Sequence, residues 1–183
     1  ELFFCNKEEA ERILGLPAGT DIRALLDGMR ALGPATVVIT DGREGAYASD
    51  GTRALYVPMY PDARQPFERT GAGDSFASTV TCALALGKPL EEALLWGPIN
   101  SMAVVQEVGA QTGLLTREQL EQYLEEAPPE LSLVGAQHGD AAERLEIGDR
   151  RREAGEQLVR RRAGLEAPPH RGRARRPRLV GPP

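Results

Sequence analysis

The residues best suited to chemistry lie in the segment 69–76, where a loop is expected to turn into an apolar helix. Gly71 and Gly73 flank Ala72, and the carboxylate of Asp74 follows directly. The first N–H groups of a helix lack intrahelical partners and the helix dipole favours negative charge, so this segment could hold a phosphate. Asp74 could then accept a proton from the group that attacks the phosphate. The alternative is an ordinary glycine-rich loop in which Asp74 only complements the dipole.

Strands and helices alternate along the chain around this segment. Residues 36–40 form a β-branched run without polar alternation, which is typical of a strand buried on both faces of a parallel sheet. Further strands are predicted at 2–5, 45–49 and 52–57, and the Asp50-Gly51 turn is expected to join the last two as a hairpin. Helices are predicted at 6–14, 20–32, 72–86, 90–108 and 116–124. This order predicts an α/β fold with a mainly parallel sheet. Ligands of such sheets collect at the carboxyl ends of the strands, where 40–42 and 71–74 are both expected.

Composition argues against several kinds of protein. The two cysteines, Cys5 and Cys82, form no disulfide framework, so we expect a reduced, cytoplasmic setting, with Cys82 as a small core residue. No apolar stretch approaches the length of a membrane span, and the acidic residues near the start do not suit a signal peptide. The two histidines, His138 and His170, both follow residue 127, which argues against a histidine triad or a zinc site. Because the chain opens at Glu1 directly on a strand, we expect a further segment before it.

Charge divides the chain near residue 127. Residues 1–126 carry 10 basic and 19 acidic side chains, whereas residues 127–183 carry 12 arginines, 8 acidic side chains and half of the 14 prolines. The second segment has too few apolar residues for a core, so it is predicted to be a disordered or loosely helical tail. Its arginine clusters leave nucleic-acid binding as an alternative, although no aromatic residues are interleaved with them. A shifted reading frame in the gene would also produce an arginine- and proline-rich segment of this kind.

Several segments of residues 1–126 together resemble the ribokinase or PfkB family of sugar and nucleoside kinases. The segment 68–74 resembles the family signature Asp-Thr-x-Gly-Ala-Gly-Asp. The resemblance implies the carboxy-terminal, nucleotide-binding part of a ribokinase-like three-layer sandwich, with Asp74 as the general base for the acceptor hydroxyl. It also implies an anion hole for the transferred phosphoryl group, formed by Gly71, Ala72 and Gly73.

Two further features of the resemblance concern metal ions. Residues 6–9 resemble the family's Asn-x-x-Glu motif, which implies that Asn6 and Glu9 organise Mg²⁺ and its waters. The alternative is a helix capping box made by the same two side chains. Glu68 stands where the family has an aspartate that helps to form a monovalent-cation site, and this departure puts potassium activation in doubt.

The remaining segments concern the nucleotide. Residues 40–45 resemble the loop that contacts the nucleotide phosphates in the family, although a plain strand-to-hairpin turn would need the same glycines. Residues 100–111 resemble the helix and loop of the adenine pocket, although close helix packing would also explain the small residues there. The implied nucleotide-binding residues are Thr40, Gly42, Gly45, Asn100, Ala103 and Gly109.

The resemblance therefore implies an ATP- and Mg²⁺-dependent kinase that phosphorylates a hydroxyl of a sugar or nucleoside. A truncated or vestigial nucleotide-binding module without kinase activity is the alternative, because the family builds most of the acceptor pocket from its other half. We expect no membrane or nucleic-acid partner, and a homodimer is a possibility for a full-length enzyme. The acceptor itself is not specified by these motifs.

Overall fold

The computed structural model describes residues 1–62, 65–129, 131 and 133–137. The greater part of the predicted tail, 138–183, lies outside the described residues. In chain order the elements are β1 (Leu2–Asn6), α1 (Lys7–Leu14), α2 (Ile22–Ala31), β2 (Thr36–Thr40), the 3₁₀ turn η1 (Gly42–Glu44), β3 (Ala46–Ser49), β4 (Arg53–Val57), α3 (Ala72–Ala85), α4 (Leu90–Val104), α5 (Arg117–Glu125) and β5 (Val134–Gln137).

The described strands form one five-stranded sheet in the order β1-β2-β3-β4-β5. Only β1 and β2 pair in parallel, and the other three pairings are antiparallel. The prediction of a mainly parallel sheet is therefore wrong for this part of the chain. The cause lies in the connections, because β2, β3 and β4 are joined by short turns at 41–45 and 50–52, whereas a parallel pair needs a long crossover. The segment with α1 and α2 provides such a crossover between β1 and β2. A long segment with α3, α4 and α5 also joins β4 to β5, but these two strands pair antiparallel.

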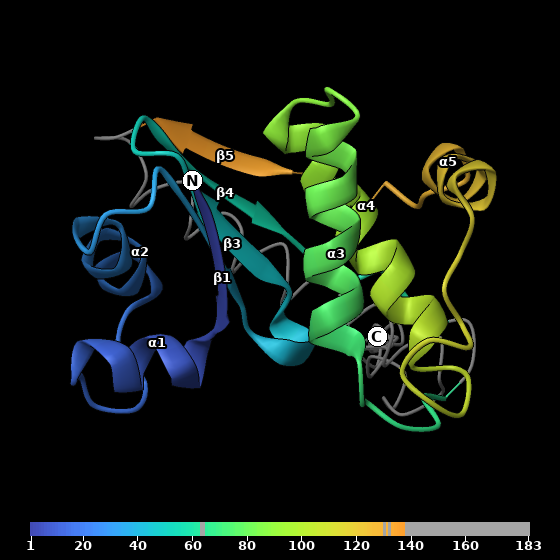
Figure 1. The fold of residues 1–183 in the computed structure, drawn as a ribbon, viewed down its shortest axis with the longest axis horizontal. Helices are drawn as coiled ribbons and strands as arrows, with labels where there is room; N and C mark the ends of the chain where they lie inside the picture. The colour runs from blue at the N-terminus through green and yellow to red at the C-terminus, as the bar shows by residue number, and fades with distance from the viewer. Residues whose placement is uncertain (63–64, 130, 132, 138–183) are drawn as a thin grey trace, which may run out of the picture.

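Helices cover both faces of this sheet, with α1 and α2 on one side and α3 and α4 on the other (Figure 1). Successive side chains of β2 pack alternately against the two helical layers. Val37 and Ile39 pack with α1 and α2, and Val38 between them packs with α3 and α4. All three side chains are fully buried, which confirms that β2 is covered on both faces. The result is a three-layer α/β sandwich.

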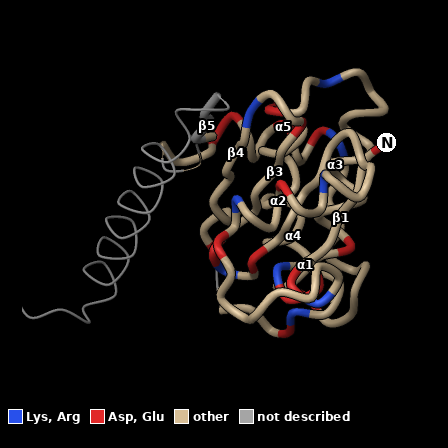
Figure 2. Tube along the Cα trace, turned by 90° about the vertical axis from the view of Figure 1, so that its left-hand side faces the viewer, with Lys and Arg blue, Asp and Glu red and all other residues tan. Residues whose placement is uncertain are grey.

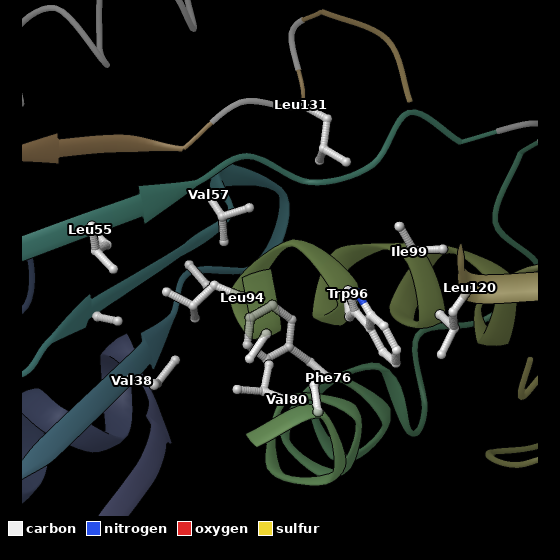
Figure 3. Close-up of a cluster of buried hydrophobic side chains, with 14 residues drawn as sticks. Val38, Leu55, Val57, Phe76, Val80, Leu94, Trp96, Ile99, Leu120 and Leu131 are labelled. Carbon is white, nitrogen blue, oxygen red and sulfur yellow. The ribbon is translucent and has the colours of Figure 1, made fainter. Parts of the chain in front are cut away.

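The larger core lies between the sheet and the α3–α4 pair. Phe76 and Val80 of α3 contact a cluster that includes Leu94 and Trp96 of α4 (Figure 3). Val57 extends the cluster onto the sheet. Burial of this apolar surface fixes α3 against the sheet, and with it the loop that precedes the helix.

Three helices begin at the residues that the sequence indicates. Asn6 and Glu9 form a reciprocal capping box at α1, with both hydrogen bonds at 2.8 Å, and Thr116 and Gln119 form another at α5. The carboxylate of Asp21 caps α2. By contrast, no side-chain hydrogen bond caps α3, which is the helix that follows the glycine-rich loop.

Two expectations about particular residues need correction. Cys82 is exposed rather than part of the core, because it lies on the side of α3 that turns away from α4 and the sheet, whereas Cys5 on β1 is buried. Residues 134–137 form β5 and pair with β4, although the sequence placed them in a tail without strands. The prediction rested on the charge and proline content of the whole tail. These averages do not reveal a short strand that forms by pairing with β4.

Acidic and basic residues are interspersed along the described chain (Figure 2). No helix among the described residues is long and apolar enough to cross a membrane.

Replacement of Phe76 by alanine tests the packing of α3. Phe76 is 2% exposed and Phe67 is 69% exposed, so the two residues form a matched pair. We expect Phe76→Ala to lower the free energy of unfolding by about 3–5 kcal/mol, because it leaves a cavity in the core. Phe67→Ala should change it by less than about 0.5 kcal/mol. Chemical denaturation measures both values, and equal effects would contradict this assignment of the core.

The two thiols should differ in reactivity. Burial and, secondarily, the negative charge of Glu9 raise the pKa of Cys5 to about 11, so its reactive thiolate is scarce at pH 8. Cys82 is exposed to reagent. Titration with a disulfide reagent at pH 8 should show one fast and one slow thiol, and unfolding should make both fast. Cys82→Ser should remove the fast phase, and a fast phase that persists in this variant would show that Cys5 is accessible.

Candidate functional site

The carboxyl ends of β1 and β2 lie side by side. The parallel register pairs Asn6 with Thr40, so the start of α1 and the loop 41–45 leave the sheet at the same edge. The amino-terminal end of α3 lies at this same end of the molecule, which is the lower end in Figure 1. The structure therefore brings three of the predicted motif segments to one end of the fold.

The loop 41–45 is a tight turn closed by main-chain hydrogen bonds. Asp41 N donates to Gly45 O at 2.9 Å, and Glu44 N donates to Asp41 O at 2.9 Å. Gly45 has a φ of 102°, and an added Cβ would collide with the carbonyl oxygen of Val57. This loop therefore has a fixed shape, and glycine at position 45 is needed both for its conformation and for the approach of β4.

The amino-terminal end of α3 is built around Gly71. This residue has a φ of 83°, and an added Cβ would lie 2.6 Å from the Cβ of Ala110. Ala72 N already donates to Arg69 O at 3.2 Å, so this N–H group closes the turn. Gly73 and Asp74 occupy the next two positions of the helix, where N–H groups point out of its end. The predicted anion hole is therefore better described by the N–H groups of Gly73 and Asp74 than by that of Ala72.

Two serines hold the start of α3 in place, and the motif analysis missed both. The hydroxyls of Ser75 and Ser101 donate to the carbonyl oxygen of Ala72, at 2.9 and 2.7 Å. Both serines are buried. Ser101 comes from α4, so these bonds tie the first turn of α3 to the neighbouring helix. A pair of buried small polar residues on two helices is a weak sequence signal, because only the packing of those helices brings them together.

Asn100 lies in the interior rather than at a surface that a base could contact. Its Nδ2 donates to Thr79 Oγ1 at 2.7 Å, and its Oδ1 accepts from Leu115 N at 3.0 Å. The side chain is buried, so both ends of the amide are used within the protein. Asn100 therefore joins α3, α4 and the segment before α5, and a direct contact with adenine is not compatible with these bonds.

Of the other two predicted adenine residues, Gly109 lies near the glycine-rich loop. Gly109 N donates to Glu68 Oε1 at 3.0 Å, and the next residue, Ala110, is the neighbour of Gly71. The helix α4 ends at Val104, before this loop, rather than near residue 108 as predicted. Ala103 lies in its last turn and is partly buried. The segments 68–74 and 109–110 therefore form one packed unit, in which one carboxylate oxygen of Glu68 holds the loop 109–110.

The Asp74 side chain is exposed at the first turn of α3. Its carboxylate is therefore accessible to a bound substrate. Its position beside an uncapped helix end also complements the helix dipole. Both roles proposed from the sequence are thus compatible with the geometry.

Asn6 and Glu9 suit a metal held through water rather than a direct cage. One oxygen of each side chain takes part in the capping box, and both residues are exposed. Within the described part of the chain, no three His, Cys, Asp or Glu residues gather in a way that could hold a metal ion. Mg²⁺ commonly keeps several waters and takes its remaining ligands from substrate phosphates. The residues present therefore fit a hydrated Mg²⁺ that arrives with a nucleotide.

Comparison with known proteins agrees with this combination of fold and motifs. The sequence profile described as pfkB family carbohydrate kinase matches residues 1–117. The chain belongs to the pfkB family. This confirms the resemblance that the four motif segments predicted.

Individual pfkB relatives show how much of the enzyme the chain covers. It is 38% identical to ribokinase of Bacillus subtilis over 94 residues, which are 51% of this chain and 31% of that protein. It is 30% identical to cytidine kinase of Thermococcus kodakarensis over 109 residues, which are 60% of this chain and 38% of that protein. The chain therefore spans well under half the length of these relatives.

A solved pfkB-type structure confirms the fold class. Ribokinase of Arabidopsis thaliana, determined with ribose and ATP, matches with a TM-score of 0.64 and 26% identity, over 68% of this chain and 41% of that one. The ribokinase-like α/β fold is thereby confirmed.

Substitution of the two glycines at α3 tests the shape of this site. Gly71→Ala should lower the free energy of unfolding by about 2 kcal/mol, because it combines an unfavourable positive φ with a collision against Ala110. Gly73→Ala is the matched control, because an added Cβ meets nothing within 4 Å and φ is not positive. Its effect should stay within about 0.5 kcal/mol. Thermal or chemical denaturation measures both, and equal losses would contradict the contact between 71 and 110.

Proposed function

We propose that the chain binds ATP and carries the phosphoryl-transfer centre of a kinase that acts on a sugar or nucleoside hydroxyl. The observation that carries the proposal is the amino-terminal end of α3. This end has no side-chain cap, is held rigidly by Gly71 against Ala110, and presents the exposed carboxylate of Asp74. Membership of the pfkB family and the identity to ribokinase support this assignment.

The main-chain groups of α3 would stabilise the transferred phosphoryl group. Phosphoryl transfer depends mostly on positioning and on stabilisation of charge, and N–H donors fixed at a helix end supply both. The N–H groups of Gly73 and Asp74 occupy the right positions in the helix. The buried serines that hold Ala72 O keep these groups from moving when charge develops.

Asp74 would take the proton of the acceptor hydroxyl. An exposed carboxylate in the first turn can reach a substrate oxygen that approaches the phosphoryl group from solvent. The hydroxyl oxygen forms a bond to phosphorus as its proton passes to Asp74, and ADP leaves. Mg²⁺, if bound, neutralises charge on the phosphates, and Asn6 and Glu9 would hold its water ligands.

The nucleotide would extend from the loop 41–45 towards the segment 109–110. Thr40, Gly42 and Gly45 belong to the strand end and loop that suit the phosphates. Ala103 and Gly109 remain candidates for contacts near the base, whereas Asn100 acts through its internal hydrogen bonds. The relatives leave the acceptor open, because one is a ribokinase and another a cytidine kinase.

A nucleotide-binding module without turnover is the second candidate. It is favoured by the extent of the match, since the chain covers 31% of one relative and 38% of another. The residues proposed for the nucleotide phosphates lie within the chain. An acceptor pocket built mostly elsewhere in the family fold would leave binding intact and remove catalysis.

Replacement of Asp74 by asparagine tests the proposed base. Calorimetry should show that the chain binds Mg²⁺–ATP, and a coupled ADP assay with ribose and cytidine should report transfer. Asp74→Asn should lower turnover by roughly two to four orders of magnitude, because a positioned base is lost, and should change nucleotide affinity only slightly. Glu118→Gln is the matched control, because Glu118 is an exposed acid in the first turn of α5.

The outcomes separate the two candidates. Nucleotide binding without transfer to either acceptor supports the binding module. Near-normal turnover of Asp74→Asn would show that this carboxylate is not the base. Absence of Mg²⁺–ATP binding by the unaltered chain would rule out both candidates for this chain.

A further inference from the structure

An ion pair joins the two motif segments at the carboxyl ends of β1 and β2. Lys7 Nζ lies 3.1 Å from Asp41 Oδ2, and the two side chains are only 28% and 25% exposed. Lys7 follows Asn6 directly, and Asp41 follows Thr40, so the pair lies one residue beyond two residues that are paired in the sheet. Partial burial reduces screening by salt, so this pair should be worth more than a fully exposed one.

Asp41 is also the residue that closes the loop 41–45. Its N–H donates to Gly45 O and its carbonyl oxygen accepts from Glu44 N, both at 2.9 Å. On the other side of the loop, the hydroxyl of Tyr56 donates to Glu44 O at 2.9 Å. The loop is thus fastened to β4 through Tyr56 and to the start of α1 through Lys7.

We propose that Lys7 and Asp41 are a positioning pair that fixes the loop 41–45 relative to the turn 6–9. In this arrangement the groups proposed for the nucleotide phosphates and those proposed for hydrated Mg²⁺ keep their relative places before the nucleotide binds. The inference rests on the proposed function, because it assigns the pair a role in nucleotide affinity. It does not require Lys7 to touch the nucleotide.

A direct role of Lys7 on the phosphates makes a different prediction. If Lys7 were a phosphate ligand, Asp41 would compete for it, and Asp41→Asn would leave affinity unchanged or increase it. If the pair positions the loop, removal of either partner loosens it. Lys7→Met would also leave the Asp41 carboxylate uncompensated beside the phosphates.

Mg²⁺–ATP affinity in four variants tests the pair. Calorimetry on the full chain should show that Lys7→Met and Asp41→Asn each weaken binding about 5- to 10-fold, which lies in the usual range of coupling between sites. The double variant Lys7→Met/Asp41→Asn should be no weaker than the weaker single variant, because the two residues act through one interaction. Lys7→Arg should restore most of the affinity, since it keeps the charge.

The second lysine of the chain supplies a matched control. The sequence contains only Lys7 and Lys88. Lys88 Nζ pairs with Glu92 Oε1 at 2.7 Å, and these side chains are 28% and 35% exposed, close to the values of the other pair. Lys88 lies in the connection between α3 and α4, at the opposite end of α3 from Gly71. Lys88→Met removes the same charge and should leave Mg²⁺–ATP affinity unchanged within about twofold.

Hydrogen exchange gives a readout that does not depend on nucleotide. Mass spectrometry should show faster deuterium uptake in the peptide covering 41–45 for Lys7→Met and Asp41→Asn, and no change there for Lys88→Met. Unaltered uptake in both variants would overturn the inference, and so would binding by Asp41→Asn that is as tight as that of the unaltered chain. If the unaltered chain binds no Mg²⁺–ATP, the proposed function fails, while faster uptake would still support the role of the pair in holding the loop.

Discussion

The burial of β2 on both faces is the constraint on which the rest of the structure depends. Val37, Val38 and Ile39 are fully excluded from water, so the strand requires a helical layer on each side. One layer is supplied by α1 and α2, and the other by α3 and α4. The candidate site lies at the carboxyl end of this strand, which is where ligands of open α/β sheets usually bind. A rigid strand thereby positions a polar loop.

Features set by neighbours in sequence could be predicted. The capping box of Asn6 and Glu9 depends on groups three residues apart, and the run 36–40 carries its own pattern of burial. The start of α3 at residue 72 follows from the glycine-rich loop before an apolar helix. Four short motifs in the right order also sufficed to recognise the family, because each is a local segment that can be read from neighbouring residues.

Features that depend on partners distant in the sequence could not be predicted. Asn100 matched a motif for base binding, yet its amide is used by Thr79 and Leu115 N, and no local pattern reveals these partners. The side of α3 that carries Cys82 and the pairing of β5 with β4 also depend on packing between elements. The hairpin of β3 and β4 was predicted from the Asp50-Gly51 turn, and the antiparallel register confirms it. The antiparallel direction of β3 against β2 could also have been inferred, since the short turn 41–45 joins the two strands.

The contact between Gly71 and Ala110 has a consequence for how this site can vary in evolution. An added Cβ at 71 would already lie 2.6 Å from the Cβ of Ala110, so the two positions share a space that is full. A larger residue at position 110 would need a smaller residue at position 71. No smaller residue exists, because glycine has no side chain. A substitution that enlarges residue 110 therefore cannot be compensated by a substitution at position 71. The neighbouring residue Gln111 is exposed, so its side chain does not compete for this space.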